Sequence, residues 1–124
     1  MKRKLLVISV ALLCSNISAT ELPRYDDGAR WAFVSGEHTT NVAVIDTFDY
    51  ILAGELTLKA EPVEMVVSDV QDLLVYIDGK THKVYSYDLI HHTHSEMSVS
   101  GVPENTIFHP DGAQLAVATH NKIE

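Results

Sequence analysis

Cysteine is nearly absent from the sequence, because Cys14 is the only one among the 124 residues. It lies in an N-terminal apolar segment, so a chain cleaved after Ala19 would have no disulfide, thiol nucleophile or thiolate metal site. The sequence also lacks a glycine-rich phosphate loop, a serine in a nucleophile-elbow context and a CxxCH haem-attachment motif. These absences remove the usual sequence signatures of thiol, phosphate-binding and covalent haem sites.

Positive charge is also scarce, with 9 Lys and Arg residues against 17 Asp and Glu residues and a net charge of −8. Three of the cations, Lys2, Arg3 and Lys4, stand at the start of the chain, and all the acidic residues follow residue 20. An acidic chain repels nucleic-acid phosphates and has little to bind an anionic membrane surface. We therefore expect no nucleic-acid partner, and no membrane partner once the N-terminal segment is removed.

Long hydrophobic runs are absent except at the N-terminus, where Leu5–Leu13 is interrupted by a single serine. A basic start, a short apolar run and small residues ending at Ala19 are typical of a secretory signal peptide. The run is too short to cross a bilayer, which needs ~20 residues. We expect residues 1–19 to direct export, to the periplasm or beyond. The alternatives are a buried N-terminal strand, or a lipoprotein signal at Cys14, which the two preceding leucines disfavour.

Two segments of the chain repeat the same pattern of strand, polar turn and strand. Trp31–Thr47 and Leu73–Leu89 both run from an apolar strand through a turn to alternating apolar residues that end in aspartate. The two aspartates, Asp46 and Asp88, are 42 positions apart in the sequence. Since a fixed period indicates a repeat protein, we interpret the chain as a repeat.

Other landmarks keep the same spacing later in the chain. Asp69 and Asp111 lie in matching turns 42 positions apart, and Val75 and Val117 lie 42 positions apart in the strands that follow. These pairs predict repeats at about 29–69, 70–111 and 112–124, after a signal at 1–19 and a lead-in at 20–28.

The strands of one unit can be placed from their Val, Ile, Leu and Tyr content. No segment after the signal shows a helical period of apolar residues, so we predict an all-β fold. Antiparallel four-stranded units of this length are typical of β-propeller blades, of which 29–124 would hold about two and a half. An antiparallel β-sandwich is the alternative. The four strands expected in the second unit are Val63–Val67, Leu73–Ile77, Lys83–Asp88 and His92–Val99.

Two stretches resemble the YVTN family of β-propeller repeats. Asn41–Leu56 resembles the Val-x-Val-Ile-Asp-Thr segment and the outer strand of that family. Phe108–Thr119 resembles its Ser-Pro-Asp-Gly turn and Tyr-Val-Thr-Asn strand, with His109 in the place of the serine. The resemblance implies a β-propeller and covers the chain from Ala29 onward.

The resemblance implies an architecture more than an activity, because the family includes binding proteins as well as redox-associated propellers. Family members often carry a histidine in a glycine-rich segment before the first strand of a blade. Here the corresponding segments, 59–62 and 101–104, contain no histidine. If redox relatives use a histidine there, these segments do not supply one.

Histidines cluster at His91, His92 and His94. On a strand, His92 and His94 would share a face and could reach one metal ion, with Asp88 and Glu96 as the nearest carboxylates. The alternative is a polar outer strand that faces solvent. We take His92 and His94 as the candidate metal ligands.

A structural role is expected for the aspartates that repeat at the turns and for one glycine. An aspartate at a strand end accepts hydrogen bonds from the backbone N–H groups of the turn that follows, and glycine accepts a positive φ. The residues given this role are Asp46, Asp69, Asp88, Asp111 and Gly112.

Three glutamates, Glu61, Glu64 and Glu104, lie at the connections between units. Such connections project toward one mouth of a propeller, where ligands bind. A patch containing Glu61 and Glu104 could attract a cation or amine, whereas the alternative is ordinary solvated charge.

We therefore expect an exported β-propeller segment that acts as a non-catalytic binding or scaffold module for a protein or small-molecule ligand, with no cofactor of its own. The alternative is part of a periplasmic redox propeller similar to the quinoprotein amine dehydrogenase or haem nitrite reductase families. Its haem or quinone would depend on residues outside this chain. An open array of blades leaves strand edges and apolar faces uncovered, so we also expect further blades or self-association.

Overall fold

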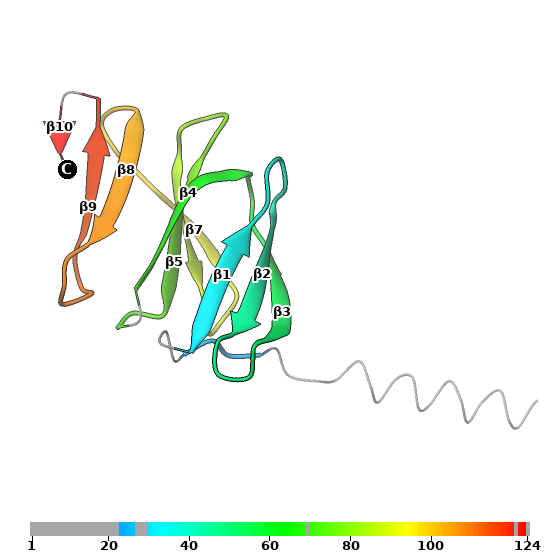
Figure 1. Cartoon of the computed structure of the whole chain (residues 1–124). Helices are drawn as coiled ribbons and strands as arrows, with labels where there is room; N and C mark the ends of the chain where they lie inside the picture. The colour runs from blue at the N-terminus through cyan, green and yellow to red at the C-terminus, as the bar shows by residue number, and fades with distance from the viewer. Residues whose placement is uncertain (1–22, 27–29, 69, 121, 124) are drawn as a thin grey trace, which may run out of the picture.

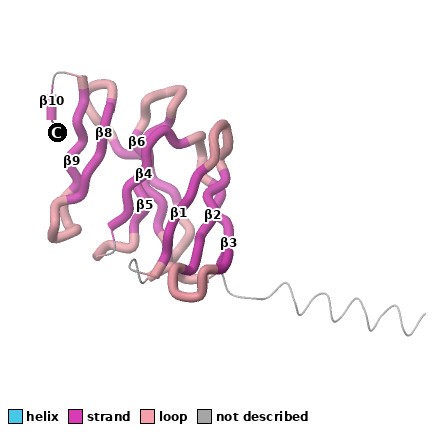
Figure 2. The backbone as a smooth tube through the Cα atoms, viewed as in Figure 1, coloured by secondary structure: helices cyan, strands magenta, loops and turns pink. Residues whose placement is uncertain are grey.

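The computed structural model describes residues 23–26, 30–68, 70–120 and 122–123, and this part of the chain is all-β (Figure 1). Strands and loops account for every described residue, as Figure 2 shows, so the predicted all-β class without helix is confirmed there. It follows that the described part has no helix long and apolar enough to span a membrane. The predicted signal at 1–19, Cys14 and Asp69 lie outside the described residues.

Ten strands form three antiparallel sheets that lie side by side (Figure 1). The first sheet has the order β1-β2-β3, the middle sheet β4-β5-β6-β7 and the third sheet β10-β9-β8. Within the described ranges the sheets contain three, four and three strands, so four strands are described in the middle sheet and three in each of the other two. The strands are β1 (Trp31–Ser35), β2 (Asn41–Asp46), β3 (Ile51–Thr57), β4 (Pro62–Ser68), β5 (Leu73–Asp78), β6 (Val84–Asp88), β7 (His94–Met97), β8 (Pro103–Phe108), β9 (Leu115–Thr119) and β10 (Lys122–Ile123).

The hairpins β1–β2 and β5–β6 share one register. Trp31 pairs with Asp46 in the first sheet, and Leu73 pairs with Asp88 in the middle sheet, so both members of the pair advance by 42 positions. The spacing inferred from Asp46 and Asp88 is therefore a structural repeat between these two hairpins.

From the middle sheet to the third sheet, the structural repeat is shorter by one position. Met65 pairs with Tyr76, and the corresponding pair Thr106 and Val117 lies 41 positions later in the sequence. A bulge near Val63 recurs near Glu104 with the same spacing. The predicted equivalence of Val75 and Val117 is therefore wrong by one position. A slip of one position moves a side chain to the opposite face of a sheet.

The shorter spacing comes from a β-bulge in β3. The register of β2 with β3 shifts between Val44 and Ile45, so Val44 pairs with Gly54 and Ile45 pairs with Leu52. Ala53 is the extra residue on the bulged strand. The β6–β7 pairing has no such shift, so β7 lacks the extra residue that β3 contains. Every later position in the chain is therefore one residue closer to its counterpart in the preceding unit. The predicted repeat limits at 70 and 112 also fall inside hairpins, between β4 and β5 and between β8 and β9.

The strand β5 is buried because both faces of the middle sheet are covered. Leu74 and Tyr76 belong to the core between the first and middle sheets, together with Val42 and Val44 of β2. Val75 and Ile77 belong to the second core, which includes Val117 of the third sheet. Alternate side chains of a strand point to opposite faces, so a strand between two sheets has to be apolar at every position.

The repeated aspartates tie the turns that follow β2 and β6. The Oδ1 of Asp46 accepts hydrogen bonds from the N–H groups of Phe48 at 2.9 Å and Asp49 at 3.3 Å. The Oδ1 of Asp88 accepts from the N–H groups of Ile90 at 2.9 Å and His91 at 2.8 Å. Each donor in the second turn occupies the same place relative to its aspartate as in the first turn, as expected for a turn built by a repeated aspartate.

The pKa values of both aspartates are held below their ordinary range. For Asp46 the main cause is the hydrogen bond from the Arg30 guanidinium, at 2.6 Å. For Asp88 burial raises the pKa, but the hydrogen bonds from His91 and Ile90 outweigh this effect. A carboxyl group with a lowered folded-state pKa stabilises the fold above its ordinary pKa, and this stabilisation is lost as the pH falls through the lowered value.

Gly112 occupies the turn between β8 and β9 with a φ of 71°, which agrees with the expected need for glycine. A Cβ atom there would lie 2.7 Å from Cβ and 2.6 Å from Cγ2 of Val70. The Gly112 carbonyl also accepts a hydrogen bond from the Ser68 hydroxyl at 2.8 Å, which joins the middle and third sheets. Asp111 accepts the Ala113 N–H at 2.9 Å in the same turn.

We predict that Asp88→Asn makes the fold less stable at neutral pH and less sensitive to acid. The charge-assisted bonds to the turn weaken, for a loss of roughly 1–2 kcal/mol in the free energy of unfolding. Thermal melts followed by circular dichroism from about pH 7 to about pH 2 measure both effects. The control is Asp111→Asn, because Asp111 is exposed and accepts one backbone bond. Equal acid sensitivity of the wild type and Asp88→Asn would contradict the assignment.

Gly112→Ala is predicted to destabilise the chain by roughly 1–3 kcal/mol, because it combines a left-handed φ with a steric clash. The comparison is Gly36→Ala, where a Cβ would approach Thr39 to 3.3 Å and no positive φ is involved. Urea unfolding of both variants measures the difference. A Gly112→Ala midpoint equal to that of Gly36→Ala would count against a strained, crowded turn.

Candidate functional site

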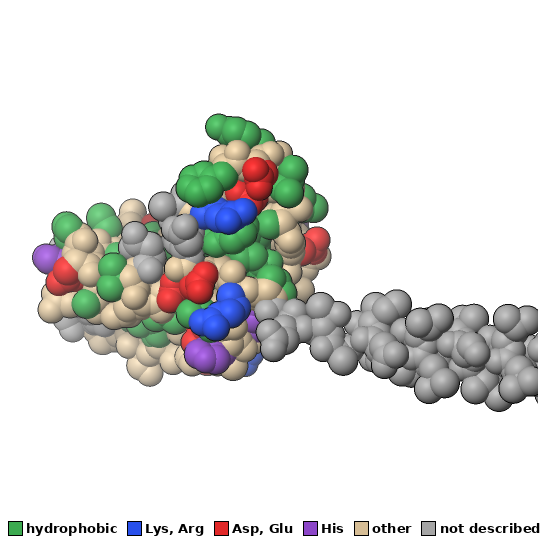
Figure 3. Space-filling model, turned by 90° about the horizontal axis from the view of Figure 1, so that it is seen from below, with side chains coloured by type: hydrophobic (Ala, Val, Ile, Leu, Met, Phe, Trp, Pro, Cys, Tyr) green, Lys and Arg blue, Asp and Glu red, His purple; other side chains and the backbone are tan. Residues whose placement is uncertain are grey.

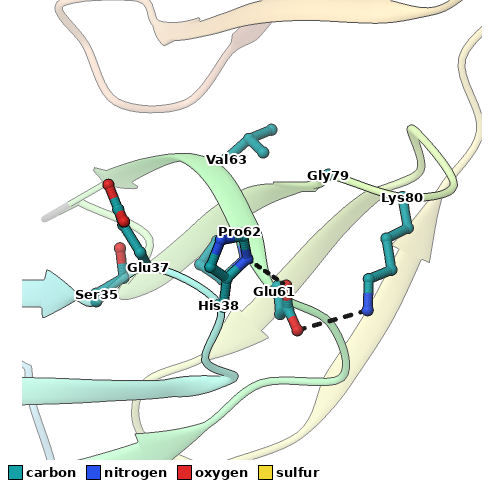
Figure 4. A pocket seen from close by; sticks show the side chains of 9 residues that line it. Ser35, Glu37, His38, Glu61, Pro62, Val63, Gly79 and Lys80 are labelled. Carbon is teal, nitrogen blue, oxygen red and sulfur yellow. Dashed lines mark hydrogen bonds and ion pairs between the residues drawn. The ribbon is translucent and has the colours of Figure 1, made fainter.

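A cleft of about 600 Å³ opens where connections of the first and middle sheets meet (Figure 4). The β1–β2 turn forms one wall, the start of β4 forms the floor and the β5–β6 turn forms the other wall. The volume is within the usual range of small-ligand sites. The residues that line it are Ser35, Gly36, Glu37, His38, Glu61, Pro62, Val63, Gly79 and Lys80.

Glu61 lies between a histidine and a lysine in this cleft (Figure 4). Its Oε2 is 3.7 Å from Nδ1 of His38, and its Oε1 is 3.5 Å from Nζ of Lys80. The Glu61 side chain is 30% exposed, against 89% for His38 and 76% for Lys80. The carboxylate is thus the fixed, half-buried charge of the cleft, and its two partners reach it from the solvent side.

The β5–β6 turn that carries Lys80 is held by Asp78. Its Oδ1 accepts the Lys80 N–H at 2.8 Å, and its Oδ2 accepts the Thr81 hydroxyl at 2.5 Å. Burial raises the pKa of Asp78, but these hydrogen bonds outweigh it and hold the pKa below the ordinary value. The turn is therefore anchored by a charged carboxylate at neutral pH.

The same turn is joined directly to the floor of the cleft. The Gly79 N–H donates to the Glu61 carbonyl at 3.1 Å. A Cβ atom on Gly79 would lie 2.5 Å from Cγ1 of Val63, so the close approach needs glycine. The positions of Glu61 and Lys80 are consequently fixed relative to each other by backbone contacts.

The arrangement suits recognition of a charged ligand. Exposed ion pairs contribute little to stability and are screened by salt. A ligand cation can therefore replace His38 or Lys80 beside the half-buried Glu61 carboxylate at small cost. The rest of the ligand would contact apolar side chains and exposed backbone, which are supplied by Pro62, Val63, Gly36 and Gly79.

The structure gives the three predicted glutamates different partners. The Oε1 of Glu64 accepts the Thr106 N–H at 3.3 Å, while its Oε2 is buried without a hydrogen-bond partner. Glu104 lies with its Oε1 at 3.1 Å from Nδ1 of His120. The position equivalent to Glu61 in the third sheet is Val102, because the repeat is one position shorter there. Of the three glutamates, Glu61 is the one that lines the cleft.

Sequence reasoning missed His38 and Lys80 as partners of Glu61. A signal was available, because the two residues are 42 positions apart and occupy the same place in the equivalent turns β1–β2 and β5–β6. Their meeting at Glu61 depends on how the two sheets pack, which the spacing does not give.

The predicted metal ligands lie against Tyr87 instead of on one open strand face. His92 precedes β7 and has a φ of 56°, so strand alternation does not apply to it. Its Nδ1 lies 2.6 Å from the Tyr87 hydroxyl, and its Nε2 lies 2.5 Å from the Pro23 carbonyl oxygen. His94 packs edge-on against Tyr87, with ring centroids 4.9 Å apart, and burial lowers its pKa.

Metal binding by this pair would require His92 to give up a hydrogen bond. In the described ranges, no three His, Cys, Asp or Glu side chains are grouped so that they could hold a metal ion.

The chain resembles a solved structure at the level of the fold. No family model matches the chain, and no curated protein matches it. The solved structure of hydrazine synthase from Kuenenia stuttgartiensis is similar, with a TM-score of 0.62 and 22% sequence identity. The match covers 81% of this chain and 30% of that chain, so this chain spans less than a third of its neighbour. A likeness at this identity shows the fold alone.

Zinc titration tests the histidine pair. Because both ring nitrogens of His92 already have partners, we predict no stoichiometric Zn²⁺ binding in the micromolar range. Isothermal titration calorimetry of the purified chain without chelator measures this. The control is His91→Ala, since His91 is exposed and outside the proposed pair. One-to-one binding that disappears in His94→Ala and persists in His91→Ala would establish a metal site.

Proposed function

We propose that this chain is part of an exported, YVTN-like β-propeller that acts as a non-catalytic binding module. The sheets would be its blades, and the ligand would bind at the connections on one mouth. Support for the architecture comes from three antiparallel sheets that repeat along the chain with nearly constant spacing. The likeness to hydrazine synthase supports a fold shared with a longer protein.

The observation that carries the binding proposal is the position of Glu61 in the cleft. Equivalent turns of two neighbouring sheets place His38 and Lys80 on either side of one half-buried carboxylate. This geometry suits a ligand that carries an ammonium or guanidinium group, such as a basic side chain of a peptide or protein loop. Neither hydrazine chemistry nor redox chemistry is assigned, because the likeness concerns the fold.

A titration with short peptides tests the proposal. The probes are a lysine-containing tetrapeptide and its glutamate-containing counterpart, added to ¹⁵N-labelled chain. We predict that the lysine peptide shifts the amide signals of Gly36, Glu61 and Gly79, and that the glutamate peptide does not. Glu61→Gln is expected to weaken this binding about tenfold, by removing a charge-assisted contact worth roughly 1.5 kcal/mol.

The matched control is Glu104→Gln, because Glu104 pairs with His120 away from the cleft. It should leave the affinity for the lysine peptide unchanged. Unshifted cleft amides at millimolar peptide, or equal binding by wild type and Glu61→Gln, would rule out the cleft as a cation-recognising site.

A further inference from the structure

The first sheet has an apolar face that points away from the middle sheet. Val42 and Val44 of β2 are buried in the core between the two sheets, so Ala43 and Ile45 point the opposite way. Across the strands, Ala43 pairs with Val34, and Ile45 pairs with Leu52. The exposed fractions are 54% for Val34 and 64% for Leu52. We call the set Ala32, Val34, Ala43, Ile45 and Leu52 the leading face.

The repeat shows what covers the corresponding face of the middle sheet. Val34 corresponds to Tyr76 and Ile45 corresponds to Tyr87 in the next unit, and both tyrosines are buried against the first sheet. Leu52 corresponds to His94, which packs on Tyr87. The leading face therefore repeats a surface that, one unit later, is covered by another sheet of the same kind.

The third sheet has an apolar face of the complementary kind. Thr106 and Val117 pair and are buried toward the middle sheet, so their neighbours Ile107 and Ala116, which also pair, point away from it. Ile107 is 66% exposed, although its counterpart in the preceding unit, Val66, packs in the core between the middle and third sheets. We call Asn105, Ile107, Ala116 and Ala118 the trailing face.

These faces occupy opposite ends of the array of sheets (Figure 1). Within the chain, the trailing side of one sheet always packs on the leading side of the next. Figure 3 shows hydrophobic side chains in groups on the visible surface, interspersed with charged ones. Polar side chains also lie beside these faces, because Glu55 pairs with Ala43 on the leading face and Asn105 with Ala118 on the trailing face.

We propose that two copies of this chain associate head to tail, with the trailing face of each on the leading face of the other. The described parts of two copies bring together six sheets, which is within the 4–8 blades of closed propellers, whereas the described part of one copy has three sheets. The ring would have two identical junctions related by a two-fold axis, each with one leading face on one trailing face. The proposal goes beyond the proposed function, on whose propeller architecture it rests, and it concerns surfaces other than the cleft.

Light scattering coupled to size-exclusion chromatography of the full chain tests the proposal. The wild type is expected at twice the mass of one chain. Val34→Glu on the leading face and Ile107→Glu on the trailing face should each give the mass of one chain. An equimolar mixture of the two variants should return to twice that mass, because one intact junction can form between them.

The control is Val102→Glu, because Val102 is 48% exposed, lies on neither face and corresponds to Glu61 of the preceding unit. It should keep the doubled mass. Far-ultraviolet circular dichroism checks that each variant is folded, and Val34→Ser replaces Val34→Glu if the latter loses its β signal. Folded Val34→Glu is also titrated with the lysine peptide. If it binds the peptide, the cleft is intact and a loss of mass reports on the association alone.

Three results would overturn head-to-tail association. A wild type at the mass of one chain, or at a mass that neither substitution changes, shows that the faces do not associate. A fall to the mass of one chain in only one of the two variants shows that the substituted face pairs with the same face of the second copy. A mixture that stays at the mass of one chain shows that the two faces are not complementary.

Discussion

Burial of the middle sheet on both of its faces is the constraint on which the rest of the structure depends. Because β5 lies between two cores, Leu74 and Tyr76 face one neighbour, while Val75 and Ile77 face the other. No position in this strand is left for a polar side chain until Asp78, which begins a turn. The turn aspartates then hold the connections in place with charged hydrogen bonds. The cleft around Glu61 exists because these connections belong to sheets that pack face to face.

Much of the fold could be predicted from the sequence, because its signals are local. The apolar strands and the Asp46 and Asp88 turns follow from alternation and from the hydrogen-bonding habits of aspartate. The shorter spacing of the third sheet could not be predicted, since Leu115, Ala116, Val117 and Ala118 are all apolar and no alternation marks the buried face. The bulge at Ala53 that causes it depends on pairing between strands, which a single strand does not reveal.

The candidate site was harder to predict than the fold, for the same reason. Glu61 could be chosen as a residue at a connection, but its partners His38 and Lys80 come from turns on two different sheets. His92 and His94 are close in sequence, which predicts a shared strand face, whereas the structure places His92 in a turn with left-handed backbone and in contact with Tyr87 and Pro23. In both cases the decisive information is tertiary packing, which fixes the environment of each side chain.

Hydrogen exchange of the backbone amides, measured by NMR, tests most directly whether the middle sheet is the centre of the fold. Amides that open only on global unfolding exchange most slowly. We predict the slowest exchange in β5 and in its partner β6, with faster exchange in the outer strands β3 and β7. Slowest exchange in β3, or uniform exchange across the three sheets, would contradict the claim that packing on both faces of the middle sheet organises this chain.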